Sequence, residues 1–284
     1  MYKPKPDKIV ICGAGTMGSG IAATTARSGY PTLLYDPRAI AIENAEKNLQ
    51  TDLDRLVEKD KITSEERRVT ISNIVFSNNI EDCKGDLVIE AIIEDVQAKQ
   101  ELFSTISALN GGETILASNT SSLSVASLAS PIPSKERFCG LHFFNPAQVM
   151  KLVEIVKTPW TSEEVITITT TFIESLDKVP VLCTDSPGFI VNRVARHYYL
   201  ESLKLLQDGV ADLETIDRVM ENAGFRMGPF RLMDLIGNDV NFAVTRSIYE
   251  AFGKAERFRP SEIQESKLTK GELGRKTGKG FYKY

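Results

Sequence analysis

The chain has 284 residues, which is long for one small domain and favours two. Its 42% of hydrophobic residues provide enough apolar material for a core and exclude a disordered chain. The net charge of −4 argues against a nucleic-acid partner bound through a broad basic face. The four cysteines lie far apart without a CxxC pair, and there are only two histidines, so we expect no metal site.

No segment has the pattern of a targeting signal or a membrane span. The start, MYKPKPDKIV, lacks the apolar stretch of a secretion signal, and no apolar run reaches membrane-spanning length. Cysteines within apolar runs are typical of buried thiols in a reducing compartment. We therefore expect a soluble cytoplasmic protein without a membrane partner, or a mitochondrial matrix protein if the chain is a processed one.

Strands alternate with helical segments over residues 1–186. The predicted strands are 8–12, 32–35, 86–93, 114–117, 138–143, 151–156 and 178–183. The predicted helices are 19–28, 39–59, 64–69 (with Ser64 as its N-cap), 96–109 and 163–176. This alternation is typical of an α/β domain with a Rossmann-type, doubly wound parallel sheet.

The pattern changes at Asp185-Ser186-Pro187-Gly188. Beyond it, residues 190–207, 213–223 and 241–252 have helical spacing, and no convincing strand follows. We therefore predict two domains, an α/β domain over residues 1–186 and an all-α domain over residues 187–284.

A glycine motif lies between the first predicted strand and the first predicted helix. Gly13-Ala14-Gly15-Thr16-Met17-Gly18 has the pattern GxGxxG. In this context the first glycine makes a tight turn, the second lets the backbone approach a pyrophosphate, and the third lets the helix pack on the sheet. The helix start then offers N–H groups to the phosphates. The motif predicts a dinucleotide site; the alternative is a glycine turn that binds nothing.

Asp36 ends the second predicted strand, at the place where an acidic residue binds the adenosine ribose. Its carboxylate would repel a 2′-phosphate, which favours NAD over NADP. Arg38, two residues on, could accept that phosphate and keeps NADP as the less favoured alternative. Asp36 could also cap the helix that follows Pro37.

His142 is the only histidine in the predicted sheet domain, and Glu154 follows it in the next predicted strand. If the chain reverses near Gln148, the two residues lie opposite each other on the same face. A carboxylate beside an imidazole fixes the ring's tautomer and prepares it to act as a general base. The alternative for a lone histidine is a structural role, which we also expect for His197.

Ser118-Asn119-Thr120-Ser121-Ser122 directly follows a predicted strand. Small polar side chains at the carboxyl end of a parallel strand lie where such sheets bind ligands. Their hydroxyl groups could orient a substrate oxygen, or they could form a polar turn in which Ser122 or Ser124 caps the next helix.

Two further polar groups lie after the domain boundary. Asn192-Arg193 opens the helical domain and could reach a ligand or brace the boundary. Lys276, in the basic and glycine-rich tail GRKTGKGFYKY, could contact a phosphate or nicotinamide, or could simply be solvated.

Seven segments of the chain together resemble the 3-hydroxyacyl-CoA dehydrogenase family, and especially its stand-alone bacterial 3-hydroxybutyryl-CoA dehydrogenases. They run from end to end in the family's order: GAGTMGSGIA, VIEAIIED, SNTSSLS, HFFNPAQVMKLVE, DSPGFIVNR, MGPFRLMDLIGND and GRKTGKGFYKY. Several such motifs with compatible spacing are far more specific than any one of them.

The resemblance implies an NAD-dependent oxidoreductase that interconverts (S)-3-hydroxyacyl-CoA and 3-oxoacyl-CoA. The expected pair is 3-hydroxybutyryl-CoA and acetoacetyl-CoA, so the substrate is a coenzyme A thioester. It implies that His142 is the catalytic base and Glu154 its partner. Ser121 and Asn192 would hydrogen-bond the substrate's 3-oxygen and its thioester end.

The resemblance also implies the binding residues around these groups. Asp36, Glu94 and Lys99 would belong to the NAD site, with Lys99 also near the coenzyme A arm. Asn145 would lie by the nicotinamide and the substrate, and Lys276 would approach the cofactor. Residues 37–69 would form a helical clamp over coenzyme A, and the helical domain would form a homodimer.

The departures from the family pattern are few. Gln148 stands where a proline is common, next to the expected chain reversal. Arg226 and Arg231 add charge near Gly228-Pro229, where they would tune either the acyl pocket or the dimer contact.

Two other kinds of protein remain as alternatives. One is a non-catalytic, NAD-binding relative such as a structural protein of the lens, but such a protein has no chemical reason to keep all four implied catalytic residues. The other is a sugar-acid dehydrogenase that relies on a lysine, and GFIVNRVARHYY has none. The acyl chain length and the physiological direction stay open.

Overall fold

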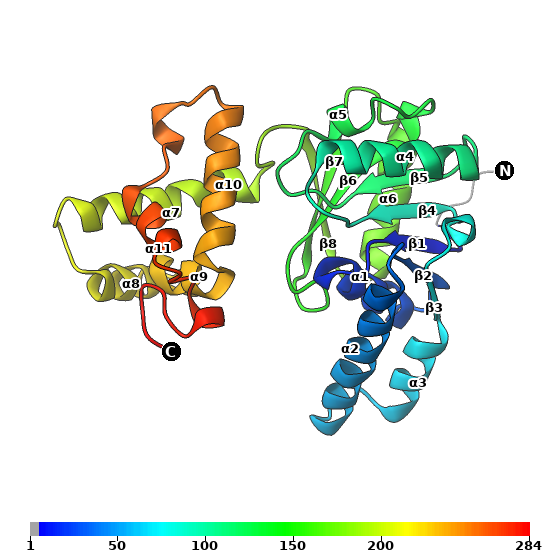
Figure 1. Ribbon diagram of the computed structural model, residues 1–284, viewed down its shortest axis with the longest axis horizontal. Helices are drawn as coiled ribbons and strands as arrows, with labels where there is room; N and C mark the ends of the chain where they lie inside the picture. Colours follow the sequence, from blue (N-terminus) through cyan, green and yellow to red (C-terminus); the bar gives the residue numbers. More distant parts are fainter. Residues whose placement is uncertain (1–5) are drawn as a thin grey trace. The chain divides into compact units, whose positions relative to one another are not determined.

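The computed structural model describes residues 6–284, shown as a ribbon in Figure 1. Residues 1–5, part of the start considered for a secretion signal, lie outside the described residues. The chain forms two compact units, of which the first ends at Asp185 and the second runs from Ser186 to Tyr284.

The first unit is built on one eight-stranded sheet with the order β3-β2-β1-β4-β5-β6-β7-β8. The strands are β1 (Ile9–Cys12), β2 (Thr32–Tyr35), β3 (Ile74–Ser77), β4 (Leu87–Glu90), β5 (Ile115–Ser118), β6 (Phe138–Phe143), β7 (Leu152–Lys157) and β8 (Val179–Thr184). All neighbours run parallel except β6 and β7, which are antiparallel. The predicted doubly wound sheet is therefore confirmed, with one reversal inside it.

Helices and short 3₁₀ turns connect these strands. They are α1 (Thr16–Arg27), α2 (Ala39–Glu58), α3 (Ser64–Ser72), η1 (Ile80–Asp82), α4 (Val96–Asn110), α5 (Val125–Leu128), η2 (Lys135–Arg137) and α6 (Glu163–Ser175). Apolar residues of α1, α2 and α6 share one core cluster with the sheet. Cys139 and Leu141 of β6 belong to that cluster, so the alternating residue Phe138 points to the opposite face, where it contacts Phe103 of α4.

Several element ends differ from the sequence-based prediction for local reasons. Thr63, rather than Ser64, caps α3: its side chain accepts from the Glu66 backbone N–H and the Glu66 carboxylate accepts from the Thr63 backbone, a capping box. The strand predicted at 86–93 ends at Glu90, and β3 was missed. β3 is a short edge strand that is only partly buried, so its apolar signal is weak.

The second unit is helical in all its regular elements. They are α7 (Val191–Gln207), α8 (Leu213–Asn222), α9 (Pro229–Ile236), α10 (Asn238–Ala251), η3 (Glu256–Phe258), α11 (Glu262–Thr269) and η4 (Arg275–Thr277). Its core contains Tyr199, Leu203, Ile216, Phe230 and Met233. The sequence-based prediction missed α9 and α11, which have eight residues each and offer little periodicity to detect.

Two fully buried carboxylates hold the loops of this unit. Asp217 accepts from the Phe230 and Arg231 backbone N–H groups and from the Tyr282 hydroxyl. Asp234 accepts from the Phe281 and Tyr282 backbone N–H groups, so the C-terminal tail is tied to α9. Hydrogen bonds to a charged acceptor are stronger than hydrogen bonds between neutral groups. These bonds therefore hold the tail in place without a further strand or helix.

The arginines at the Gly228-Pro229 turn differ in their contacts. The Arg231 guanidinium donates to Glu221 at 3.0 Å and lies over the Tyr282 ring at 5.1 Å. Arg231 therefore braces its own unit, whereas Arg226 is exposed.

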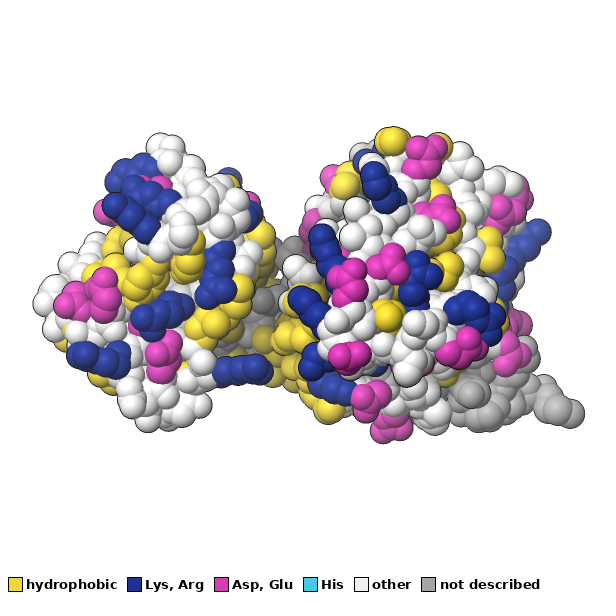
Figure 2. Space-filling view, turned by 90° about the horizontal axis from the view of Figure 1, so that it is seen from below, with side chains coloured by type: hydrophobic (Ala, Val, Ile, Leu, Met, Phe, Trp, Pro, Cys, Tyr) yellow, Lys and Arg dark blue, Asp and Glu magenta, His cyan; other side chains and the backbone are white. Residues whose placement is uncertain are grey.

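The surface of the helical unit carries exposed apolar groups, and Figure 2 shows hydrophobic patches on its visible face. Over the whole unit, the exposed large hydrophobic side chains are Ile190, Val194, Val210, Val219, Phe225, Leu235, Ile236, Val240 and Tyr284. Within residues 6–284, none of the helices combines the length and the apolar character needed to cross a membrane.

Glu272 provides a test of how the tail is held. Its carboxylate accepts from Lys267 at 2.7 Å and pairs with Lys279, and hydrogen bonds from these two lysines lower its pKa to about 2. A carboxyl group with a lowered folded-state pKa stabilises the fold above its unfolded pKa and loses that contribution as the pH falls. The Glu272 contribution should therefore be complete above about pH 4.5 and fade towards pH 2.

We expect Glu272→Gln to lower the melting temperature at pH 7 and to approach the wild type at pH 3, as followed by circular dichroism. Asp208→Asn, which breaks the exposed pair with Lys204, is the control and should have little effect at either pH. An equal deficit of Glu272→Gln at both pH values would contradict the ion-pair explanation.

Candidate dinucleotide and catalytic site

The glycine loop between β1 and α1 has the geometry that a pyrophosphate cradle requires. Gly13 has φ +112°, and a Cβ there would lie 2.5 Å from the Ala91 carbonyl oxygen. A Cβ on Gly18 would lie 1.7 Å from the Gly13 oxygen, so the first and third glycines are needed for the turn and the helix packing. A Cβ on Gly15 would meet nothing within 4 Å, so that side of the backbone is open to a ligand.

The start of α1 has the polarity that a phosphate needs. Gly15 is its N-cap, no side chain caps the helix, and its first turn contains no acidic residue. The first N–H groups of a helix lack partners inside it and bear the positive end of the helix dipole. The loop Gly13–Gly18 therefore fits a dinucleotide pyrophosphate.

Asp36 lies beside this loop, immediately after β2. It is buried, and its Oδ2 accepts from the Ala14 backbone N–H at 3.1 Å. Arg38 donates to both carboxylate oxygens, at 2.9 and 3.0 Å. Burial acts to raise the pKa of Asp36, but the hydrogen bonds from Arg38 and the Ala14 N–H outweigh it and the pKa is lowered. Asp36 is therefore held as a carboxylate at the glycine loop.

His142 and Glu154 meet across the antiparallel pair β6 and β7. The register places them directly opposite each other, as their even spacing predicts. The His142 Nδ1 and the Glu154 Oε2 lie 2.7 Å apart, and both side chains are buried. The Phe144 ring lies 4.4 Å from the imidazole, centroid to centroid. Because a carboxylate only accepts hydrogen bonds, Nδ1 bears the proton in this contact and Nε2 is the basic ring nitrogen.

The polar loop after β5 is organised around Glu94. The Glu94 Oε1 accepts from the Thr120 hydroxyl at 2.6 Å and from the Ser121 and Ser122 backbone N–H groups at 3.0 and 3.2 Å. Burial acts to raise the pKa of Glu94, but the charge of Lys99 and these hydrogen bonds lower it. Asn119 joins the loop to the His142 strand, since its Oδ1 accepts from the Phe143 N–H at 2.9 Å. The structure thus connects Ser121, Glu94 and Lys99 in one network.

Sequence reasoning missed one member of this network, Glu90. It ends β4, is fully buried, and pairs with Lys99. Burial raises its pKa, against the opposing effect of the Lys99 charge. An acidic residue at the end of the otherwise apolar run Leu87–Glu90 was the available signal.

The remaining predicted residues lie in more exposed places. Asn145 is exposed in the loop after β6. Asn192 lies in the first turn of α7, and Lys276 in η4 pairs with both carboxylate oxygens of Asp239 at 2.6 Å. Asn192 and Lys276 belong to the helical unit, so their relation to His142 stays a prediction. The expected clamp region, 37–69, contains α2 and most of α3, joined by an Arg67–Asp54 ion pair at 2.5 Å.

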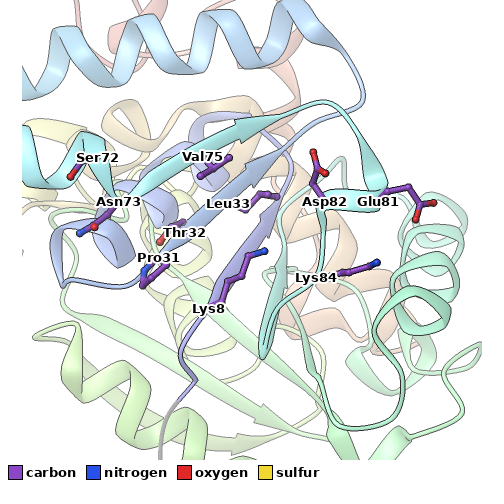
Figure 3. Close-up of a pocket in the computed structure, with 10 residues that line it drawn as sticks. All are labelled: Lys8, Pro31, Thr32, Leu33, Ser72, Asn73, Val75, Glu81, Asp82 and Lys84. Atoms are coloured by element: carbon purple, nitrogen blue, oxygen red, sulfur yellow. The ribbon is translucent and has the colours of Figure 1, made fainter.

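The cavity shown in Figure 3 lies away from the glycine loop and from the His142–Glu154 pair. It measures about 690 Å³ and is bordered by Lys8, Thr32 and Asn73, at the amino ends of β1, β2 and β3. The glycine loop and Ser118 lie at the carboxyl ends of their strands, so none of the predicted residues borders this cavity. Among the described residues, no group of three or more His, Cys, Asp or Glu side chains could hold a metal ion.

The sheet and its glycine loop define a dinucleotide-binding α/β protein, and comparisons with known proteins identify the family. The domain described as "3-hydroxyacyl-CoA dehydrogenase, NAD binding domain" matches residues 8–186. The domain described as "3-hydroxyacyl-CoA dehydrogenase, C-terminal domain" matches residues 188–284. The chain belongs to the 3-hydroxyacyl-CoA dehydrogenase family of oxidoreductases.

Individual relatives agree with this assignment. The chain is 44% identical over 276 residues to the 3-hydroxyadipyl-CoA dehydrogenase of Escherichia coli K12, covering 96% of this chain and 58% of that protein. It is 38% identical over 284 residues to the mitochondrial hydroxyacyl-coenzyme A dehydrogenase of Sus scrofa, covering 97% and 90%. A crystal structure of 3-hydroxybutyryl-CoA dehydrogenase from E. coli K12 superposes with a TM-score of 0.95 at 43% identity, covering 98% of this chain and 60% of that one. The chain thus spans about three fifths of the length of both E. coli proteins.

The two glycine positions allow the binding role of the loop to be separated from its structural role. Gly15→Ala should keep the melting temperature, because its φ of −76° suits any residue and the added methyl group meets no atom. It should weaken NADH binding at least about tenfold, since the methyl group occupies the approach of the pyrophosphate. Gly18→Ala should instead lower the melting temperature. Fluorescence titration with NADH and thermal unfolding measure the two effects, and unchanged NADH affinity in Gly15→Ala would exclude the cradle.

Proposed function

We propose that the protein catalyses the NAD-dependent interconversion of (S)-3-hydroxyacyl-CoA and 3-oxoacyl-CoA, with 3-hydroxybutyryl-CoA and acetoacetyl-CoA as its acyl pair. The observation that supports this most directly is the buried 2.7 Å contact between His142 and Glu154 in the unit that contains the glycine loop. An imidazole held by a carboxylate is the general base that removal of a hydroxyl proton needs. The names of the relatives support an acyl-CoA substrate.

The proposed chemistry divides between the cofactor and the chain. NAD supplies the hydride acceptor for the hydrogen on the substrate's C3. The Nε2 of His142 takes the hydroxyl proton, and Glu154 stabilises the imidazolium through Nδ1. In the reverse direction, the same Nε2 donates that proton to the 3-oxo group.

The polar groups around the histidine position the substrate in this proposal. Ser121 and Asn192 hydrogen-bond the 3-oxygen and the thioester end, and Asn145 places the substrate beside the nicotinamide. Lys99 serves the cofactor site and the coenzyme A arm, and Lys276 approaches the cofactor. Positioning and preorganised charge then supply most of the rate.

Asp36 is the proposed selector of NAD over NADP. Its buried carboxylate lies against the glycine loop, where it would accept from a ribose hydroxyl and repel a 2′-phosphate. Arg38 is already committed to both oxygens of that carboxylate, which reduces its availability for a phosphate.

We further propose that α2 and α3 form the clamp over coenzyme A and that the helical unit forms a homodimer. The exposed apolar side chains on that unit support an interface, because monomers rarely leave large apolar patches in water. The expected compartment is the cytoplasm, or the mitochondrial matrix for a processed chain.

The reaction is tested by mixing the purified protein with acetoacetyl-CoA and following the loss of reduced-cofactor absorbance, in parallel with NADH and NADPH. We expect rapid loss with NADH and little with NADPH. A preference for NADPH would keep the reaction and overturn the role of Asp36. No loss with either cofactor would exclude the proposed reaction with this substrate and favour a sugar-acid or non-catalytic relative.

The His142–Glu154 pair is tested by two substitutions that remove the titrating group. His142→Gln should lower kcat by about two to four orders of magnitude, the usual loss when acid–base catalysis is removed. Its NADH affinity should stay near that of the wild type, which shows that the fold and the cofactor site are intact. Near-normal turnover would exclude His142 as the base.

Glu154→Gln should also lower kcat, because a neutral amide cannot stabilise the imidazolium. Its pH–rate profile should move to lower pH, since the protonated ring loses its carboxylate partner. His197→Gln, in the helical unit, is the control and should leave both rate and profile unchanged. An unmoved profile in Glu154→Gln would contradict the proposed pair.

A further inference from the structure

Glu90 is a fully buried carboxylate that the proposed chemistry does not use. It is the last residue of β4, and the register places it between Cys12 of β1 and Ser118 of β5. It therefore lies at the carboxyl edge of the sheet, between the strand that leads into the glycine loop and the strand that leads into the loop of Ser121. Burying an ionised carboxylate is costly unless it is paired and hydrogen-bonded.

Three donors from three places in the chain satisfy this carboxylate. The Ile92 backbone N–H donates to Oε1 at 2.7 Å, and the Ser118 hydroxyl donates to Oε2 at 2.7 Å. The Lys99 ammonium also donates to Oε1, and that side chain is 1% exposed. Glu90 thus joins the turn after β4, the end of β5 and helix α4.

Lys99 extends the network to a second carboxylate. Its Nζ lies 3.3 Å from the Glu94 Oε2, while Glu94 uses its other oxygen to hold the backbone and hydroxyl groups of Thr120, Ser121 and Ser122. Two acidic residues therefore share the ammonium: Glu94 binds Thr120, Ser121 and Ser122, and Glu90 binds Ser118 where the loop begins. The position of Lys99 therefore sets the position of the positive charge beside the Glu94 carboxylate.

The network closes on itself. The Ser118 hydroxyl donates to Glu90 and accepts from the Thr120 backbone N–H at 3.2 Å, and the Thr120 hydroxyl donates to Glu94. We call this closed set the Glu90 ring; it contains Glu90, Lys99, Glu94, Thr120 and Ser118. Because the ring is closed and largely buried, loss of one member changes the geometry of the others.

We propose that Glu90 is a positioning residue that holds Lys99 against Glu94 and thereby orders the loop 118–122 for cofactor and substrate. This inference rests on the proposed function, because it assigns the loop to that site. Glu90 itself touches neither reactant; it acts through Lys99 on one side of the ring and through Ser118 on the other. Its effect should therefore appear in binding rather than in the chemical step.

The test is Glu90→Gln, which keeps the size of the side chain and removes its charge. We expect the Kd for NADH and the KM for acetoacetyl-CoA to rise about tenfold or more, the effect of losing a hydrogen bond to a charged group. The kcat at saturation should change by less than about threefold, because a group that binds ground state and transition state alike alters KM alone. A purely structural role would lower the melting temperature without raising the Kd of the folded protein.

Two controls accompany this variant. Glu101→Gln makes the same substitution at an exposed residue of α4 outside the ring. The Glu101 carboxylate accepts from Gln97, and the variant should match the wild type. Ser118→Ala cuts the other side of the ring with a small change of volume and should raise the Kd in the same direction. It keeps the test decisive if Glu90→Gln does not fold.

A double-mutant cycle identifies the path of the effect. Because Glu90 acts in part through Lys99, the loss of NADH affinity in Glu90→Gln combined with Lys99→Met should be smaller than the sum of the losses in the two single variants. Additive losses, or wild-type Kd and KM in folded Glu90→Gln, would overturn the inference. If the wild type itself neither binds NADH nor reduces acetoacetyl-CoA, the proposed function fails and this inference fails with it.

Discussion

A buried carboxylate needs hydrogen-bond donors from within the protein. Two buried carboxylates impose this requirement on the first unit. Glu90 and Glu154 are both completely shielded from water. Each can remain ionised only if a neighbouring element brings a donor to a fixed place. For Glu154 the donor is His142, opposite it across β6 and β7, and for Glu90 the donors come from β5, α4 and the turn after β4. The need to give each buried carboxylate a hydrogen-bond donor therefore holds these side chains in one orientation. The backbone alone would leave them free to rotate.

The antiparallel pair β6 and β7 determines where the His142–Glu154 contact lies. His142 lies near the end of β6, and the reversal places Glu154, near the start of β7, directly opposite it. The pair thus stays at the edge where β1 and β5 also end and where the glycine loop and the polar loop begin. Asn119 strengthens this arrangement because it binds the backbone of Phe143.

The helical unit uses the same physical solution for a different purpose. Asp217 and Asp234 are buried carboxylates that accept from backbone N–H groups in the first turn of α9 and in the C-terminal tail. Here the buried carboxylates anchor the start of a helix and the C-terminal tail, whereas in the sheet the buried carboxylates orient side chains. Glycines make this possible: a Cβ on Gly228 would lie 2.4 Å from Asp217, and one on Gly280 would lie 1.9 Å from Asp234.

Three features could be predicted from the amino-acid sequence: the alternation of strands and helices, the glycine loop with Asp36 beside it, and the opposition of His142 and Glu154. These follow from local spacing: apolar runs, a motif between a strand and a helix, and an even separation across a reversal. Three contacts became visible in the folded chain alone: Glu90 pairs with Lys99, Glu94 binds the loop of Ser121, and Arg231 pairs with Glu221 in its own unit. Those contacts join residues from different elements. Local spacing cannot show which buried charge will meet which donor, because that depends on how the whole sheet and its helices pack.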